Sequence, residues 1–542
     1  MSRLSMNIKA IAILVFVLSG INNLPCFAQK NEIWQRTYGI PDRFDIIYSA
    51  KSSYDHGYVV GINASSETPN DYFIWLVKTD INGNILWSKS LYNADILIYL
   101  ASFDIDENGE IILTGQINQY DEWGDVFIMR LNACGEKVWC KVIRYFNMNY
   151  GYRVKIKPDG NYALYTRYAA PQGYKADKLW IIDTAGNNLS SFYIVPPGTH
   201  PNIGDPLVED FIITSDQGYL FSGSCYFPLD TLNPTMWRLQ HMLVKVDSLG
   251  NGQWIRPLYL DTNHEGVIPN TIEYLDKYFA VGYDYILSKQ RSSTFVHFSA
   301  YNGKFDFSGN LLYETTLQTD TIVNMLLGLK TTADGALIQA AKISHNLTGG
   351  PPRVLGLFKT DTAFNVLVSL ENDTGSVYNE CITSSIDGKF LITGYCPPES
   401  SYTEVDGLAI KVNSDLQYDS LYSFPFVYDS LCPFPILTDT IDCDCDIITG
   451  YGEPAGTEER YRLHIFPNPA AEKVQVRLKD VIGGNAIGGG KLILYDLFGR
   501  KILTRDFRKE TEVDVSALYA GIYLLAVERK GRILAREKLV VL

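Results

Sequence analysis

The sequence is poor in histidine, the residue that most often builds catalytic and metal sites. It has seven histidines in 542 residues, and none lies near another at the spacing of a metal site or a catalytic triad. The segment Cys443-Asp444-Cys445 lacks the second Cys or His pair that a zinc site needs. Residues 104–109 begin like a calcium loop, but Gly115 stands where an EF-hand places its glutamate. We therefore expect no metal, no cofactor and no catalytic residues.

The sequence also lacks a hydrophobic run long enough to cross a bilayer, which takes about 20 residues. Its N-terminal apolar stretch, Ala10 to Leu18, is shorter and follows two basic residues, Arg3 and Lys9. The small residue Ala28 then provides a cleavage position, so we predict a secretory signal peptide at residues 1–28. We expect an exported protein without a membrane span.

Acidic residues outnumber basic residues in the middle of the chain. The net charge is −14 overall, but residues 465–542 carry +5 and residues 1–28 carry +2, so residues 29–464 carry −21. An acidic body repels phosphate backbones, and nucleic acid is therefore not an expected partner.

The middle of the chain does contain an internal repeat. A hairpin turn followed by a short apolar strand, such as Gly57-Tyr58-Val59-Val60-Gly61, occurs seven times. Its turn positions are Gly57, Gly109, Gly160, Gly218, Lys277, Gly335 and Gly388, which are 51 to 59 residues apart. A period of this length is typical of the blades of a β-propeller.

Each copy continues with two further strands. The second strand ends in a basic residue before a turn-forming Asp or Asn, as at Lys78, and the third often carries tryptophan, as at Trp87. One tryptophan-type strand, residues 32–39, precedes the first full copy. Pairing this strand into the last repeat would close a ring and remove a free sheet edge.

We therefore predict an all-β fold with a seven-bladed β-propeller over residues 29–430. An eight-bladed propeller is the alternative, because Ile447 to Tyr451 echoes the repeat and could form a truncated last copy. We prefer to place that segment in a linker at residues 431–464, since prolines surround it.

Residues 465–542 hold several separate motifs. Alternating segments such as Val474 to Leu478 have the two-residue period of half-buried strands, which predicts a small antiparallel sandwich. The motif positions are Pro467, Asn468, Pro469, Tyr495, Asp496, Gly499, Arg500, Leu518, Gly521 and Tyr523. In type and order they resemble the type A C-terminal sorting domain of the type IX secretion system, for which we expect an immunoglobulin-like β-sandwich.

The resemblance implies that the type IX secretion machinery is a partner of the tail. It further implies that the protein is carried across the outer membrane of a gram-negative bacterium, to the medium or to the outer-membrane surface, and that the tail is normally removed. The repeats in turn resemble the imperfect propeller repeats found in front of such sorting domains, over roughly Ile33 to Phe424.

Eight cysteines remain after the signal peptide, an even number in an oxidising compartment, so disulfides are expected. Cys134 and Cys140 flank one hairpin, Cys381 and Cys396 lie in neighbouring stretches of one repeat, and Cys432 is close in sequence to Cys443 or Cys445. Cys225 would pair with the cysteine that these pairs leave over.

Two classes of function stay open for the body. The first, which we prefer, is a secreted or surface-displayed binding or structural propeller whose loops contact an extracellular protein or glycan, because loops on a rigid scaffold usually carry recognition. The second is a secreted glycan-active hydrolase that uses the propeller channel. An acidic or arginine-lined channel would favour the enzyme.

Overall fold

The computed structural model describes residues 33–41, 43–65, 72–92, 97–118, 124–143, 149–169, 175–194, 206–228, 237–258, 264–290, 293–317, 322–344, 353–372, 376–396, 405–424, 426–433, 436–447, 461–480, 490–495, 501–508, 510–529 and 532–541. The predicted signal peptide lies outside these ranges. The chain divides into two compact units, Met1–Thr449 and Gly450–Leu542. Within the described ranges there is no helix of the length and apolarity that crossing a membrane requires.

The described part of the first unit contains seven sheets, which we number along the chain. Sheet 1 contains β2 (Asp45–Ser52), β3 (Tyr58–Ser65), β4 (Tyr72–Thr79) and β5 (Ile85–Leu91). Sheet 2 contains β6 (Ile98–Ile105), β7 (Ile111–Ile117), β8 (Asp125–Leu131) and β9 (Lys137–Ile143). Sheet 3 contains β10 (Asn149–Ile156), β11 (Tyr162–Ala169), β12 (Lys175–Ile182) and β13 (Asn188–Tyr193). Sheet 4 contains β14 (Pro206–Ile213), β15 (Tyr219–Pro228), β16 (Trp237–Val246) and β17 (Gly252–Leu258).

The remaining sheets repeat this order. Sheet 5 contains β18 (His264–Tyr274), β19 (Lys277–Gln290), β20 (Ser293–Phe305) and β21 (Leu311–Thr316). Sheet 6 contains β22 (Ile322–Thr331), β23 (Leu337–Ser344), β24 (Arg353–Thr360) and β25 (Val366–Asn372). Sheet 7 contains β26 (Ser376–Ser384), β27 (Phe390–Cys396), β28 (Asp406–Val412) and the N-terminal strand β1 (Gln35–Tyr38). Two short strands, β29 (Asp439–Ile441) and β30 (Asp446–Ile447), add a fifth strand to sheets 1 and 2.

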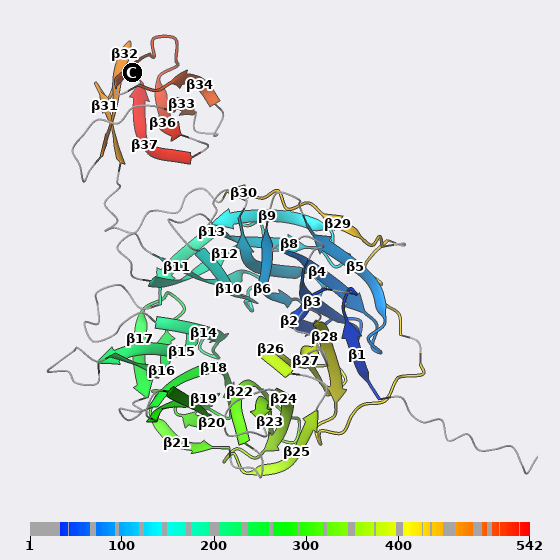
Figure 1. Ribbon diagram of the computed structural model, residues 1–542. Helices are drawn as coiled ribbons and strands as arrows, with labels where there is room; N and C mark the ends of the chain where they lie inside the picture. Colours follow the sequence, from blue (N-terminus) through cyan, green and yellow to red (C-terminus); the bar gives the residue numbers. More distant parts are fainter. Residues whose placement is uncertain are drawn as a thin grey trace, which may run out of the picture. The chain divides into compact units, whose positions relative to one another are not determined.

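The seven sheets follow one another around a common centre (Figure 1). The first strand of each sheet contacts the first strand of the next, from β2 through β6, β10, β14, β18 and β22 to β26, and β26 contacts β2. Apolar side chains fill the space between neighbouring sheets, as in the clusters between sheets 1 and 2 and between sheets 3 and 4. The all-β prediction is confirmed, and the repeats form antiparallel four-stranded sheets.

The strand predicted to join the chain ends is also confirmed. β1 pairs antiparallel with β28, with Gln35 opposite Ile410 and Tyr38 opposite Gly407. Just before β1, the indole of Trp34 is buried and its Nε1 donates a hydrogen bond to the carbonyl of Ile81 in sheet 1 at 2.6 Å. The N-terminal segment therefore belongs to the last sheet and contacts the first.

The tryptophan of the repeat has the same role in several sheets. It lies on the fourth strand of one sheet, or directly before it, and packs on the glycine of the last turn in the next sheet. The pairs are Trp34 with Gly83, Trp87 with Gly135, Trp139 with Gly186 and Trp254 with Gly309. Gly83 and Gly309 have φ of +77°, and a Cβ on either would come within 2.9 Å of the indole. The repeated Trp and Gly therefore specify a contact between sheets.

The repeated basic residue acts within its own sheet. It reaches from the third strand to an acid in the first hairpin turn. The pairs are Lys78–Asp55 at 2.5 Å, Arg130–Glu110 at 2.5 Å, Lys245–Asp216 at 2.9 Å, Lys359–Asp334 at 2.7 Å and Lys411–Asp387 at 2.6 Å. These residues of the repeat are therefore explained by the fold rather than by catalysis.

One of these pairs predicts a pH dependence. Burial raises the pKa of Asp387, but hydrogen bonds from Lys411 and Tyr422 outweigh burial and lower the pKa to about 2. An unfolded Asp has a pKa of about 3.9, so this carboxylate contributes stability above that pH and loses it as the pH falls toward 2. Between pH 6 and pH 3 we expect wild-type protein to lose about 1 kcal/mol more unfolding free energy than Asp387→Asn. Urea unfolding at both pH values measures the difference.

Asp334→Asn is the matched control for this measurement. Hydrogen bonds from Lys359 and Thr332 also lower the pKa of Asp334 to about 2, but its side chain is 55% exposed. Solvent screens an exposed pair, so a smaller pH effect is expected there. Identical pH dependence in Asp387→Asn and wild type would contradict the assigned role of Asp387.

The second unit consists of two sheets around one core. One sheet contains β31 (Tyr461–Phe466), β32 (Lys473–Asp480) and β35 (Glu510–Asp514). The other has the order β34 (Lys501–Asp506), β33 (Lys491–Tyr495), β36 (Gly521–Arg529) and β37 (Arg532–Val541). The alternation predicted for β32 is confirmed, because Val474, Val476 and Leu478 are buried in the shared core while the residues between them are exposed.

The structure differs from the expected linker at residues 431–464. Residues 426–433 and 436–447, which we call the strap, belong to the first unit. Ile447, considered as the start of an eighth repeat, lies in β30 and pairs parallel with Val142 of β9. The alternation of apolar residues and aspartates from Ile441 to Asp446 gives the strap one buried face, and nearby prolines do not prevent this short pairing.

Candidate functional site

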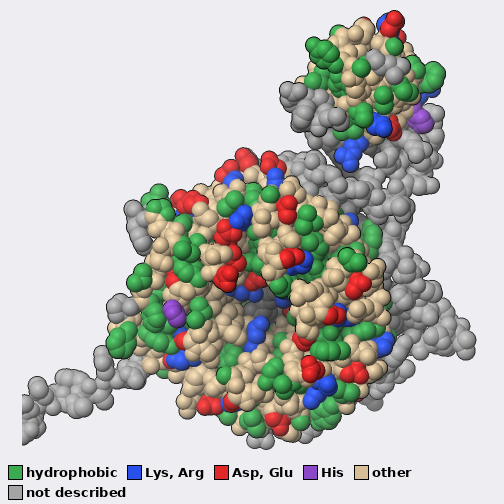
Figure 2. All heavy atoms as spheres, turned by 180° about the vertical axis from the view of Figure 1, so that it is seen from behind, with side chains coloured by type: hydrophobic (Ala, Val, Ile, Leu, Met, Phe, Trp, Pro, Cys, Tyr) green, Lys and Arg blue, Asp and Glu red, His purple; other side chains and the backbone are tan. Residues whose placement is uncertain are grey.

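The first strand of every sheet, next to the centre of the ring, is interrupted by a register shift. The shifts lie between Ile47 and Ser49 in β2, Leu100 and Ser102 in β6, Gly151 and Arg153 in β10, and Val208 and Asp210 in β14, with others in β18, β22 and β26. Bulges re-aim side chains and are frequent beside functional sites. Figure 2 shows a hollow at the centre of this unit with Lys or Arg side chains inside it. The residues around the centre decide what this hollow can do.

Several charged residues on the first three strands of sheets 3 and 4 pair with one another. The buried carboxylate of Asp210 in β14 lies 3.3 Å from Lys155 Nζ and 3.7 Å from Arg153 Nε, both on β10. In sheet 3, Arg167 forms hydrogen bonds of 2.8 and 3.2 Å to the buried carboxylate of Asp177. These pairs join neighbouring strands and sheets, so opposite charges compensate one another at these positions.

One Ser-His-Asp set comes together between sheets 4 and 5, which sequence spacing did not indicate. Ser224 and His241 lie opposite each other on β15 and β16, and His241 Nε2 is 3.1 Å from Asp284 Oδ1. Ser224 is 1% exposed and His241 0%, and among the described residues neither Ser224 Oγ nor His241 Nδ1 has a hydrogen-bond partner. A catalytic triad needs a reachable nucleophile that is hydrogen-bonded to its base. The set therefore lacks the arrangement of a triad, and the His241 ring packs against Tyr301 of sheet 5 with 4.2 Å between ring centroids.

Tyrosines gather at the end of the ring where β2 and β4 begin and β3 and β5 end, which we call the loop end. The rings of Tyr72 and Tyr99 lie 5.2 Å apart between centroids, and Tyr48 is 39% exposed. Burial raises the pKa of Tyr48, and the Tyr72 hydroxyl adds to this shift. Beside these tyrosines, the Asn63 side chain joins sheets 1 and 2 through two hydrogen bonds to the Leu100 backbone. It donates to the Leu100 carbonyl at 2.9 Å and accepts from the Leu100 N–H at 2.8 Å. The loop end thus presents aromatic rings on a fixed base.

The calcium-loop-like segment, residues 104–109, belongs to a hairpin. Asp106 Oδ1 accepts from the backbone N–H groups of Asn108 at 3.0 Å and Glu110 at 2.8 Å. Asp104 Oδ2 accepts from the N–H of Ile156 in the next sheet at 3.0 Å. A cavity of about 600 Å³ lies beside this turn, but these carboxylates already have partners. In the part of the chain that the structure describes, no three His, Cys, Asp or Glu residues are placed to hold a metal ion.

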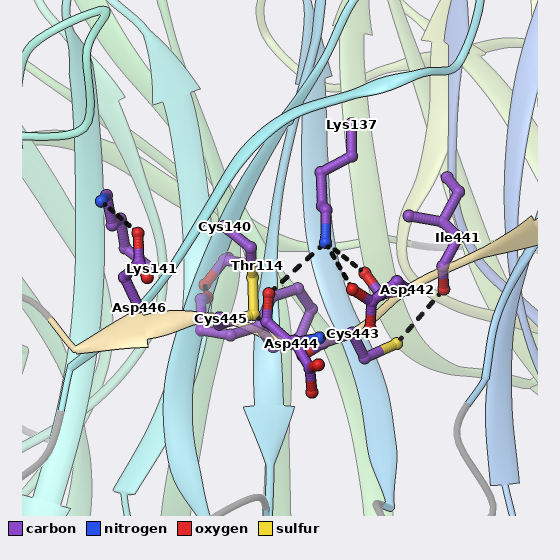
Figure 3. Close-up of a disulfide and its surroundings, with 11 residues drawn as sticks. Thr114, Lys137, Cys140, Lys141, Ile441, Asp442, Cys443, Asp444, Cys445 and Asp446 are labelled. Atoms are coloured by element: carbon purple, nitrogen blue, oxygen red, sulfur yellow. Dashed lines mark hydrogen bonds and ion pairs between the residues drawn. A yellow bond between two sulfur atoms is a disulfide. The ribbon is translucent and has the colours of Figure 1, made fainter.

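The strap carries two disulfides. Cys134 is bonded to Cys432 and Cys140 to Cys445, across 298 and 305 residues of sequence. Figure 3 shows the Cys140–Cys445 bond. This pairing corrects the expectations that Cys134 and Cys140 bridge one hairpin and that Cys432 pairs within its own segment. The correction follows from the fold, because the strap runs back from sheet 7 and lies against the outer strands of sheets 1 and 2.

The other cysteines were also placed differently than expected. Cys381 and Cys396 are not bonded to each other, since Cys381 lies at the irregular part of β26 and Cys396 ends β27. Cys443 in the strap has a free, buried thiol, and burial raises its pKa to about 12. Cys225 is buried in sheet 4.

The strap binds sheets 1 and 2 through alternating residues. Ile441, Cys443 and Cys445 are buried, whereas the aspartates between and after them are exposed. Three aspartates of the strap pair with lysines of the outer strands: Asp439 with Lys89 at 2.7 Å, Asp442 with Lys137 at 3.2 Å and Asp446 with Lys141 at 3.0 Å. Figure 3 shows the second and third of these pairs. An acidic segment therefore lies on a row of lysines, with the Cys140–Cys445 bond beneath it.

The beginning of the strap is fixed to sheet 1. The N–H of Asp429 donates to Asp55 Oδ2 at 3.0 Å, and Trp87 Nε1 donates to Asp429 Oδ1 at 3.2 Å. Burial raises the pKa of Asp429. Nearby, the N–H of Ile81 donates to the Tyr428 hydroxyl at 3.0 Å. Both ends of the strap are thus held by side chains of the ring.

In the second unit the motif Pro467-Asn468-Pro469 is bound to β37. Asn468 Nδ2 donates to the Lys538 carbonyl at 2.6 Å, and Asn468 Oδ1 accepts from the N–H of Val540 at 2.8 Å. The prolines have no N–H group, so the asparagine side chain provides the bonds that a neighbouring strand would make.

The other motif residues have the following places. Tyr495 ends β33, Gly521 begins β36, Leu518 packs against the shared core and the Tyr523 hydroxyl donates to the Tyr519 carbonyl at 2.9 Å. Asp496, Gly499 and Arg500 lie outside the described residues. Phe466 and Tyr519 are 76% and 90% exposed, which leaves two aromatic side chains open on this small unit.

Comparison with known families identifies the tail. Residues 464–542 match the family described as the secretion system C-terminal sorting domain, as the motif residues predicted. No curated protein matches the chain.

Solved structures resemble the chain only distantly. An ulvan lyase, described as a new family of polysaccharide lyase, is 9% identical, with 70% of this chain and 96% of that chain covered and a TM-score of 0.43. A Hadza microbial sialidase is 11% identical, with coverage of 65% and 73% and a TM-score of 0.38. A protein of unknown function from Bacteroides caccae is 11% identical, with coverage of 61% and 94% and a TM-score of 0.33. At these TM-scores the likeness carries no argument.

Proposed function

We propose that the unit before residues 464–542 is exported cargo. Residues 464–542 match the C-terminal sorting domain of the type IX secretion system, so the protein is secreted or displayed at the cell surface. We propose that this cargo, residues 29–430, is a seven-bladed β-propeller that binds an extracellular protein or glycan. The closed order of contacts from β2 to β26 supports seven blades rather than eight. The two sheets around one core in residues 465–542 support an immunoglobulin-like sandwich for the tail.

The observation that carries the binding function is the tyrosine group at the loop end. Tyrosine offers a large, rigid ring with one polar atom and loses little conformational entropy on binding, so it is favoured at recognition surfaces. Tyr48, Tyr72 and Tyr99 come from two sheets that Asn63 fixes to each other, which preorganises the rings. The exposure of Tyr48, 39%, leaves ring surface for a ligand.

Export is the part of the function that belongs to the tail. The type IX secretion machinery is its partner, and the exposed rings of Phe466 and Tyr519 are the first residues that we would test for contact with it. The bonds from Asn468 to β37 hold the chain directly after Phe466, so this ring leaves the sandwich from a fixed point.

Purified protein screened on glycan arrays and against extracellular protein extracts tests the binding function. For any ligand found, the double variant Tyr48→Ala/Tyr72→Ala is expected to weaken binding at least about tenfold, because a buried aromatic contact contributes about 1–2 kcal/mol or more. Tyr313→Ala is the matched control, since Tyr313 is 47% exposed on β21 at the outer edge of sheet 5. Turnover of glycosidase or peptidase substrates by the purified protein would instead favour the hydrolase alternative.

A further inference from the structure

We propose that the strap is a redox latch, which closes the ring a second time and fixes the chain that leads to the sorting domain. The first closure is the pairing of β1 with β28, which joins the two chain ends within sheet 7. The second runs from residue 426 across sheet 1 to sheet 2, where Cys432 and Cys445 bond to Cys134 and Cys140. The closed covalent loop contains the last strand of sheet 2, all of sheets 3 to 6 and the C-terminal strands of sheet 7.

Outside the buried side chains of Ile441, Cys443 and Cys445 and the hydrogen bonds of Asp429, the non-covalent contacts of the strap are short or exposed. β29 pairs with β5 over three residues and β30 with β9 over two. Asp439, Asp442 and Asp446, the acidic partners of the lysine row, are 42%, 59% and 81% exposed. Exposed ion pairs contribute little, because solvent screens them and both side chains lose freedom. Once the two disulfides are reduced, we expect these contacts to be too few to keep the strap on the ring.

The chemistry of closure is oxidation of two thiol pairs. Each pair loses two protons and two electrons as its S–S bond forms, and a disulfide-bearing oxidant takes them up and becomes a dithiol or two thiols. Reduction by an external dithiol reverses both steps. In the closed strap the third thiol, Cys443, does not attack either bond readily, because a thiol must be a thiolate to attack a disulfide and burial raises the pKa of Cys443 to about 12.

Opening the latch would change two surfaces. It would uncover the outer edges of β5 and β9, which the strap now covers. It would also release the chain up to Ile447, the last described residue before the second unit. In the oxidising medium outside the cell the latch stays closed, so a chain whose tail has been removed still ends in a segment that is bound to the ring.

Limited proteolysis of the full chain tests the latch. Oxidised and dithiol-reduced protein are digested briefly, and mass spectrometry maps the cuts in residues 426–447 and in sheets 3 to 6. We expect cleavage in the strap to be at least tenfold faster after reduction, while the sheets stay protected. Cys432→Ser/Cys445→Ser should behave like reduced protein under all conditions. Cys443→Ser, in the same strap, should behave like oxidised wild type, and oxidised glutathione should restore protection only where both bonds can form.

Two results would overturn the proposal. If the reduced strap is as resistant as the oxidised strap, the short pairing and ion pairs hold it and the disulfides are not a latch. If reduction exposes sheets 3 to 6 to cleavage together with the strap, the disulfides stabilise the whole ring. They would then not control a segment that opens by itself. Reduction of already folded wild type decides between these outcomes even if the double variant fails to fold.

Discussion

A chain that ends at Thr449 is expected to remain in the cell, with at least about tenfold less protein in the medium or on the surface than for the full chain. The truncation removes residues 464–542, the match to the sorting domain family. It falls at the division between the two compact units and after β30, so every described strand of the ring and both disulfides are kept. Immunoblots of cell and medium fractions, together with surface labelling, measure the distribution.

Two controls separate loss of sorting from loss of folding. The truncated chain should keep the protease resistance of the full-length ring, because the second unit has its own core. Residues 450–542 placed after an unrelated folded reporter with a signal peptide should carry that reporter out of the cell. A truncated chain that still reaches the medium would show that the tail is not the sorting signal of this protein.

Trp34→Ala is expected to lower the unfolding free energy of the ring by about 4 kcal/mol. Removing a fully buried aromatic side chain costs about 3–5 kcal/mol, from lost transfer energy and the cavity left behind. Trp34 is 1% exposed, packs edge-on against Tyr58 with 5.9 Å between ring centroids and donates to the Ile81 carbonyl. Its loss also frees the end of β1, so rapid cleavage in residues 33–41 should accompany the loss of stability. Urea unfolding and peptide mapping provide the two measurements.

Trp254→Ala is the matched control for the closing contact. Trp254 packs on Gly309 as Trp34 packs on Gly83, and its Nε1 donates to the Phe307 carbonyl at 3.0 Å. Its contact joins sheets 4 and 5, which are consecutive in the chain, and its side chain is less buried. We expect a smaller loss of stability and no cleavage in residues 33–41. Equal losses with β1 still protected would mean that Trp34 packs like any other repeat tryptophan and does not secure the closure.

Local pattern explains which features were predictable. The tight turns, the alternation in β32 and the recurring Trp and Lys each depend on residues close in sequence, so they can be recognised without a structure. The contacts of Lys78 and Trp34 could not be predicted from local sequence. Their partners, Asp55 and Ile81, follow from how strands pair within a sheet and how one sheet packs on the next.

The disulfides and the Ser224–His241–Asp284 set show where sequence-based prediction ended. Cys134 and Cys432 are 298 residues apart, and many pairings of eight cysteines agree equally well with their spacing. Ser224 and His241 are cross-strand neighbours only because β15 and β16 pair in one register, and a shift of either strand by one residue would turn its side chain to the other face of the sheet.

By itself, the sequence determined the sheet type, the repeat, the closing strand and the sorting tail, because the residues that indicate each of them are close together in the chain. Only the tertiary structure decided that the segment before the tail is a strap, which cysteines it joins and which side chains reach the surface. Those features depend on distances between residues far apart in the chain. Such distances follow from the closure of the ring as a whole and from no single repeat.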